Sequence, residues 1–179
     1  TTLKTYCESG SFARGKESLS GLASIAMFGN TNQPVDVMVK SSHLFMPMPD
    51  VIREDMAFID RLHFYIPGWE IPKMRVEFFT NHYGFVVDYL AEALRELRKH
   101  NFTEMIDRFY SLGSHLNARD VKAVRKTVSG MIKLVYPHGE VSSEDLAELL
   151  EIALEGRRRV KEQLKKMGSF EYHQTSFSY

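Results

Sequence analysis

The second half of the chain carries three series of apolar residues at helical spacing, and these series constrain the fold more than any other feature. Apolar side chains recur every three or four positions, with charged residues between them, and this pattern is typical of an amphipathic helix that buries one face. We therefore expect helices through most of 73–167, with a shorter helix over 102–112. The three series are Phe85, Val86, Tyr89, Leu90, Ala93, Leu94 and Leu97; Val121, Val124, Val128, Met131, Ile132 and Val135; and Leu146, Leu149, Leu150, Ala153, Val160, Leu164 and Met167.

Capping residues mark the ends of the later two helices. Asn117, followed three residues later by Asp120, predicts an N-terminus, and Pro137 stops the same helix. Ser142 or Ser143 can cap the next helix. The region from 73 to 167 is thus predicted to be all-α.

The first 72 residues have a different sequence pattern. Short apolar runs alternate there with Gly, Pro, Ser and Asn, which punctuate strands and loops. The runs at 22–28, 35–39 and 62–66 predict strands, and a short helix is expected near 50–57. The predicted fold class is an α/β fragment followed by an all-α region, with 168–179 as a linker or tail.

Composition excludes several classes of function. Lys+Arg and Asp+Glu both number 23, so no overall basic field points to nucleic acid, although local clusters could still bind it. The single cysteine, Cys7, excludes an internal disulfide framework and favours a reducing compartment. The seven histidines lack metal-ligand spacing, so no metal site is predicted. No apolar run is long enough to span a membrane, and we expect a cytoplasmic protein without a membrane partner.

Residues 10–16 match the first seven positions of the phosphate-binding P-loop pattern G-x-x-x-x-G-K. The eighth position is Glu17, whose carboxylate would repel phosphates where a hydroxyl should face magnesium. We therefore favour a glycine-flanked hairpin that carries Arg14 and Lys16, and this tip could contact a polyanion or simply be solvated. A compact P-loop enzyme that uses Lys16 is the remaining alternative.

Three polar residues stand at positions that allow nucleotide chemistry. Asn30 follows an apolar run, Arg61 follows Asp60, and Arg119 lies in the first turn of a predicted helix, where a cation opposes the helix dipole. Each also has a structural explanation: a turn residue for Asn30, and local ion pairs for the two arginines. The basic stretch from Arg157 to Arg159, with Lys161, Lys165 and Lys166, is explained adequately by solvation and a favourable dipole, and this explanation is favoured over a specific nucleic-acid role.

Residues 58–69 resemble a segment of Lon-type AAA+ proteases with the sequence Leu-Leu-Asp-Arg-Met-Glu-Val-Ile, followed by Gly-Tyr. This resemblance gives the three polar residues a common interpretation. The wider chain resembles the Lon-like AAA+ proteins of BREX phage-defence systems, the BrxL family. The residues that carry this likeness are 8–12, 14–17, 29–30, 44–69, 126–130 and 168–172.

The resemblance implies an architecture. Residues 1–72 would be the second half of an AAA+ α/β core, with a hairpin at 10–21 that faces the central pore. Residues 73–167 would be a helical lid of about four helices. Asn30 would be sensor 1, Arg61 an arginine finger acting in trans on a neighbouring subunit, and Arg119 the sensor 2 residue.

The resemblance also implies a function for an intact parent protein. The parent would be a ring-forming homo-oligomeric ATPase that uses ATP and Mg²⁺ to handle DNA or polypeptide in phage defence, with Arg14 and Lys16 as DNA contacts. This chain lacks Walker A, Walker B and the Ser-Lys protease residues. We therefore expect an internal fragment that is inactive alone and binds no cofactor alone. The alternative is a non-enzymatic helical module that binds another protein.

Overall fold

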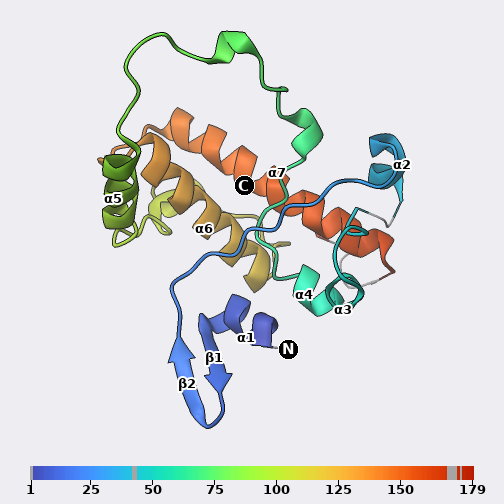
Figure 1. The fold of residues 1–179 in the computed structure, drawn as a ribbon. Coiled ribbons are helices and arrows are strands. Elements are labelled where there is room, and N and C mark those ends of the chain that lie inside the picture. Colours follow the sequence, from blue (N-terminus) through green and yellow to red (C-terminus); the bar gives the residue numbers. More distant parts are fainter. Residues whose placement is uncertain (1, 42–43, 169–172, 174) are drawn as a thin grey trace.

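Two long helices form the centre of the molecule. In the computed structural model, which describes residues 2–41, 44–168, 173 and 175–179, α6 (Ala118–Val135) and α7 (Ser143–Lys166) pack against each other (Figure 1). Both helices were predicted from their apolar series. The structure is mostly helical, with one small two-stranded sheet in the described residues.

The caps of both helices lie where the sequence predicts them. The Asn117 side chain accepts hydrogen bonds from the backbone N–H groups of Arg119 and Asp120, each at 3.0 Å. Asp120 in turn accepts the N–H of Asn117 at 3.2 Å, which completes a capping box. Ser142 caps α7 by accepting the N–H of Asp145 at 3.1 Å. These bonds satisfy donors that a helix start otherwise leaves unpaired.

The hydrophobic core has two parts, and α7 contributes to both. The first part joins α6 to the N-terminal half of α7 through buried residues such as Val128, Ile132 and Leu150. The second part joins Val160 and Leu164, near the end of α7, to Phe45 and Ile59 from the N-terminal region. Helix α7 therefore connects the two halves of the chain.

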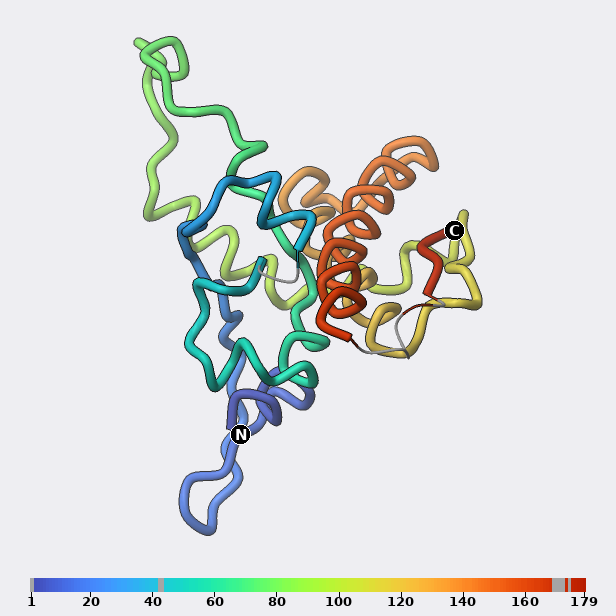
Figure 2. Tube along the Cα trace, turned by 90° about the vertical axis from the view of Figure 1, so that its right-hand side faces the viewer, coloured from blue at the N-terminus to red at the C-terminus, as the bar shows by residue number. Residues whose placement is uncertain are grey.

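The N-terminal region begins with a helix and a hairpin. Helix α1 (Thr2–Ser9) leads into β1 (Ser11–Arg14) and β2 (Glu17–Ser20), which pair antiparallel with Arg14 opposite Glu17. Gly15 has φ +64 in the turn, a conformation that favours glycine. The hairpin projects away from the helices in both views (Figures 1 and 2). A hairpin at this position was expected in place of a P-loop.

The strands predicted at 22–28, 35–39 and 62–66 are wrong. Residues 21–34 and 62–67 run without regular strand or helix, and α2 (Val35–Lys40) replaces the second strand. A strand needs a neighbouring strand for its backbone groups, and the described residues offer these runs none. Pro34, with φ −52, precedes the first turn of α2, and Asp36 lies in that turn, where its charge suits the helix dipole.

The remaining elements are short or exposed. The helix expected near 50–57 is divided into α3 (Asp50–Arg53) and α4 (Met56–Ile59). The helix predicted over 102–112 is reduced to a 3₁₀ turn, η3 (Met105–Arg108), and two more such turns follow α4, η1 (Gly68–Glu70) and η2 (Val76–Phe78).

Helix α5 (Val87–Leu97) forms as predicted but buries none of its residues. The segment that precedes it loops away from the helical body (Figure 2) and exposes apolar side chains. Of the predicted tail, residues 169–172 and 174 lie outside the described residues. Within the described part of the chain, no helix is both long and apolar enough to cross a membrane.

Candidate anion-binding site

A buried ion cluster lies where the end of α4, the start of α6 and the middle of α7 meet. Its four charged members, Asp60, Asp120, Arg157 and Lys161, have at most 1% of their surface exposed. Charges are rarely this buried unless they are paired, and two carboxylates here face two cations. The cluster is thus neutral by itself, and Arg119 approaches it from the surface.

Asp60 is the common acceptor for three basic side chains. Its Oδ1 accepts hydrogen bonds from Arg157 Nη2 at 2.8 Å and Lys161 Nζ at 3.0 Å, and its Oδ2 accepts one from Arg119 Nη1 at 2.9 Å. Burial alone would raise the pKa of Asp60, but the hydrogen bond and charge of Lys161, with Arg157 and Arg119, leave that pKa below its usual value. Asp60 is therefore ionised at neutral pH.

Asp120 joins the same cations from the first turn of α6. Its Oδ1 accepts a hydrogen bond from Arg157 Nε at 2.9 Å and lies 3.3 Å from Lys161 Nζ. Its Oδ2 serves the capping box. One carboxylate thus caps a helix and neutralises two buried cations. Removing one partner of such a cluster leaves an uncompensated buried charge, which typically costs about 3–5 kcal/mol.

Beside the cluster is a small opening that collects basic side chains around one carboxylate. Glu8, from α1, lies 3.1 Å from Arg61 Nε, 3.8 Å from Arg119 Nε and 3.9 Å from Lys122 Nζ. The opening is lined by Cys7, Glu8, Asp60, Arg61, His63, Arg119 and Lys122. The opening has a volume of about 10 Å³, room for about one water, so a phosphate could enter only by displacing Glu8. Two guanidinium groups and an ammonium group are the kind of donors that bind phosphate.

Arg61 is held at this opening by its environment. Only 17% of its side chain is exposed, and Nη1 donates to the backbone carbonyl of Ala57. Its Nε is buried and, among the described residues, makes no hydrogen bond, although Glu8 is within ion-pair distance. A buried donor that lacks an aligned acceptor is costly, so this atom favours an anionic ligand that is better aligned than Glu8.

His63 lies in the same opening in its neutral form. Burial, and then the positive charges of Lys126, Arg157 and Lys122, lower its pKa to about 4. The imidazole therefore adds no charge at neutral pH. It can donate or accept a hydrogen bond there.

The structure brings together two of the residues that the sequence predicted for the site, Arg61 and Arg119, and places the other three elsewhere. Arg61 and Arg119 both contact Glu8. Asn30 lies in the exposed irregular segment after the hairpin, and Arg14 and Lys16 are exposed at the hairpin turn.

Comparison with known proteins identifies the family. The family model described as "Lon-like protease BrxL-like, ATPase domain" matches residues 1–178. The chain belongs to this family. It is 60% identical over 177 residues to the Lon-like protease BrxL of Bacillus cereus (strain H3081.97), and 56% identical over 177 residues to that of Escherichia coli O9:H4 (strain HS). Each alignment covers 99% of this chain but only 26% and 25% of the respective relative.

The BrxL-family chain thus spans about a quarter of the length of these curated relatives. The match confirms the resemblance drawn from residues 58–69 and the longer sequence blocks. It places Arg61 and Arg119 in an ATPase domain, and their assignment as nucleotide contacts remains a prediction.

The explanation of Arg157 to Arg159 and Lys161 as a solvated helix end is wrong for two of these residues. Arg157 and Lys161 are fully buried, whereas Arg158 and Arg159 pair with Glu155 near the surface. The apolar series contained a signal for this, because Ala153, Arg157, Lys161 and Leu164 follow one face of α7 at helical spacing. Cations on a buried face predict buried acids elsewhere in the chain.

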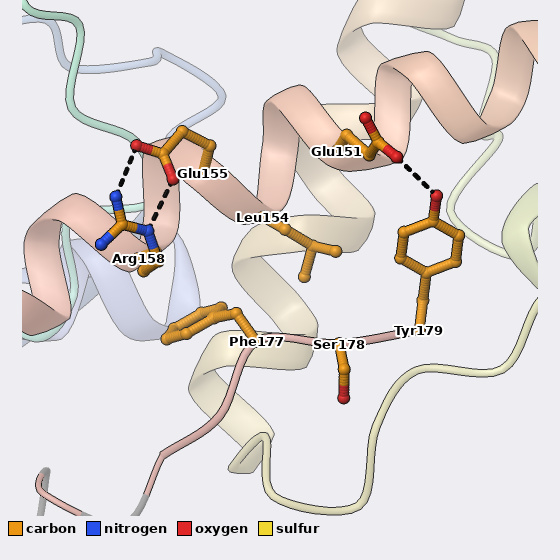
Figure 3. Close-up of a pocket in the computed structure, with 7 residues that line it drawn as sticks. All are labelled: Glu151, Leu154, Glu155, Arg158, Phe177, Ser178 and Tyr179. Atoms are coloured by element: carbon orange, nitrogen blue, oxygen red, sulfur yellow. Dashed lines mark hydrogen bonds and ion pairs between the residues drawn. The ribbon is translucent and has the colours of Figure 1, made fainter.

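A second, larger pocket of about 360 Å³ lies where the C-terminal residues run along α7 (Figure 3). Its polar groups are already paired with one another: Tyr179 donates to Glu151 at 2.9 Å, and Arg158 pairs with Glu155. It therefore offers a ligand little that is not already satisfied. Among the described residues, no group of three or more His, Cys, Asp or Glu side chains could hold a metal ion.

Proposed function

We propose that this chain is part of the ATPase module of a Lon-like AAA+ ring protein, in which Arg61 and Arg119 contact nucleotide phosphates. The proposal includes the division into a core half at 1–72 and a helical lid at 73–167. In the intact protein, ATP hydrolysis would drive the handling of DNA or polypeptide in phage defence. The observation that carries the proposal is the convergence of Arg61, Arg119 and Lys122 on one carboxylate.

Glu8 serves as the resident counter-ion of this opening. Its side chain is 46% exposed, so it can leave toward solvent more easily than the buried aspartates can. A phosphate group carries more charge and more acceptor oxygens than a carboxylate, and it would replace Glu8 as the partner of a guanidinium group at this opening. The cations would then stabilise the charge of a transferring phosphoryl group.

The two arginines have different proposed partners in the ring. Arg119 acts on the nucleotide of its own subunit, and Arg61 acts in trans on that of its neighbour. Asn30, as sensor 1, would orient the attacking water. ATP supplies the phosphoryl group and Mg²⁺ neutralises its oxygens, but the described residues contain no acidic cluster for the ion, so no Mg²⁺ ligand is assigned to this chain.

Mixed rings of the full-length protein test these roles. Arg61→Ala and Arg119→Ala subunits should each lose ATPase activity, by a factor of ~10³ or more for a transition-state arginine. If Arg61 acts in trans and Arg119 in cis, mixing the two variants restores activity. At some interfaces the Arg61→Ala subunit then supplies Arg119 and the Arg119→Ala subunit supplies Arg61.

Full activity in either single variant would refute the nucleotide role of that arginine. Inactive single variants whose mixture stays inactive would refute the division between cis and trans. Subunit exchange in the mixture is verified with differently labelled chains. The control mixes each variant with wild-type subunits, which should give intermediate activity.

The hairpin tip is proposed as the DNA contact. Arg14 and Lys16 are exposed on an element that projects from the molecule (Figure 2). Replacing both with Ala in the full-length protein should weaken DNA binding and reduce its salt dependence by about two phosphate contacts. The control is Ala at Arg95 of α5 and at Lys99 just after that helix, which pair with acids of α5. Equal loss in both variants would contradict a specific role for the tip.

A helical module that binds another protein is the second candidate function. The apolar side chains of the segment before α5 favour it: Val76, Phe79 and Val86 expose 82%, 67% and 67% of their surface. A nucleotide-independent partner that binds this segment, in a protein whose Arg61→Ala variant remains active, would favour this candidate over the ATPase role.

A further inference from the structure

Each of the two site arginines is next in sequence to a buried aspartate. Asp60 precedes Arg61, and Asp120 follows Arg119. The two aspartates come from segments sixty residues apart in the chain, yet both bind the same guanidinium group, that of Arg157 in α7. The segment around each site arginine is therefore held to Arg157 through the neighbouring aspartate.

Arg157 satisfies three acceptors from these two segments at once. Its Nε donates to Asp120 at 2.9 Å, its Nη2 to Asp60 at 2.8 Å and its Nη1 to the carbonyl of Leu62 at 2.6 Å. Two of these acceptors, the carboxylate of Asp60 and the carbonyl of Leu62, belong to the residues on either side of Arg61. A planar guanidinium fixes the directions of all three bonds, which an ammonium cannot do.

Lys161, one helical turn later, supplies charge to the same carboxylates without that geometry. Its Nζ lies 3.0 Å from Asp60 and 3.3 Å from Asp120. Charge compensation and geometry are thus divided between two residues of α7. Arg157→Lys therefore keeps the positive charge and removes only the planar arrangement of hydrogen-bond donors.

The network is not required for stability in principle, because well-packed apolar residues often replace buried ion clusters without loss. Its specific consequence is orientation. Asp60 holds Arg119 directly through its second oxygen, and Arg157 holds Asp60. The chain of contacts from α7 to the opening is therefore continuous.

We propose that Arg157 is a positioning residue, which fixes the 60–62 segment and the start of α6 and so sets the direction in which Arg61 and Arg119 each present a guanidinium group to a nucleotide phosphate. This inference rests on the proposed nucleotide role of the two arginines. Arg157 does not itself touch the ligand. It sets the geometry of the residues that do.

The test is a double-substitution cycle in the full-length protein, read as the affinity for a fluorescent ATP analogue. Arg157→Lys should weaken binding by about tenfold, within the range of coupling between residues of one hydrogen-bond network. In an Arg119→Ala background the same substitution should have little further effect, because it acts through Arg119. Arg158→Lys, on the exposed side of the same turn, is the matched control and should leave affinity unchanged.

The outcomes distinguish a failure of the positioning role of Arg157 from a failure of the nucleotide role of Arg119. A tenfold loss in both backgrounds means that Arg157 acts through general stability, and unchanged affinity in the wild-type background means that it does not act at all. Either result overturns the positioning role. If Arg119→Ala by itself leaves the affinity for the ATP analogue unchanged, Arg119 does not contact the bound nucleotide, and Arg157 then has no contact of Arg119 to position.

If Arg157→Lys does not fold, as judged by circular dichroism, Asp60→Asn provides the same cycle. It keeps the shape of the side chain and removes the charge that holds Arg119. Its effect should likewise be absent in the Arg119→Ala background, and an undiminished effect there would overturn the proposal.

Discussion

Gly156 allows the 62–65 segment to cross α7 at close range, and this contact yields the most direct test of the fold around the site. A Cβ added at Gly156 would lie 2.2, 2.3 and 2.5 Å from the Cε2, Cδ2 and Cζ atoms of Phe64. The backbone N–H of Tyr65 donates to the carbonyl of Gly156 at 3.1 Å, which holds the segment in place. Gly156→Ala must therefore displace the Phe64 ring or the segment.

Two effects of opposite sign determine the result. In a helix interior, Ala is favoured over Gly by up to about 1 kcal/mol. Overpacking a filled site typically costs about 1–3 kcal/mol. We expect Gly156→Ala to be destabilising by up to about 2 kcal/mol, because the contact is far inside van der Waals range.

Gly130 provides the matched control. It lies inside α6, and a Cβ there would meet nothing within 4 Å. Gly130→Ala should therefore show only the propensity gain, a stabilisation of about 0.5–1 kcal/mol. The difference between the two variants then measures the cost of the Phe64 contact.

The assay is urea unfolding followed by circular dichroism at 222 nm. The midpoint should rise for Gly130→Ala and fall for Gly156→Ala, with unchanged slopes. Equal stabilisation by both substitutions would refute the close crossing of the 62–65 segment over α7.

Three further predictions concern the opening and the start of α6. Because the pKa of His63 falls to about 4 in the folded state, the unfolded chain binds the extra proton first, so this group's contribution to stability is complete above pH 6.5 and is lost as pH falls toward 4. The loss in the free energy of unfolding is at most about 3 kcal/mol. His63→Gln should therefore make the free energy of unfolding less dependent on pH between 6.5 and 4. The same pH dependence in the variant and the wild type would contradict the shift. Glu8→Gln should tighten binding of an ATP analogue by the full-length protein severalfold, since it removes the competing carboxylate; weaker binding in a calorimetric titration would mean that Glu8 supports the site. Asn117→Ala should lower stability by about 1 kcal/mol through loss of the cap, whereas Asn101→Ala, which removes a bond to Thr103 outside any helix start, should have a smaller effect in the same urea assay.

Local rules identified the elements whose determinants lie within a few residues of one another. The cap at Asn117, the stop near Pro137 and the apolar spacing of α6 and α7 are all short-range features, and the helices form where these features predict them. The glycine-flanked stretch at 10–16 was also predicted as a hairpin, because Glu17 does not fit a P-loop. The family, too, was evident from residues 58–69 and the longer blocks.

Strand prediction failed for a physical reason. An apolar run such as 22–28 becomes a strand only when another strand accepts its backbone hydrogen bonds, and the described residues provide no such partner. The same run is compatible with an exposed extended segment. Neighbouring residues cannot distinguish these states.

The sequence by itself determined the two long helices, their caps, the hairpin and membership of the BrxL ATPase-domain family. Only the tertiary structure decided that Arg157 and Lys161 are buried, that Asp60 binds three cations and that Arg61 and Arg119 meet at Glu8. The three pairs of Asp60 join residues 59 to 101 positions apart. Helix caps and periodicity act over one or two turns, whereas a buried charge is defined by whichever distant partner the fold places beside it.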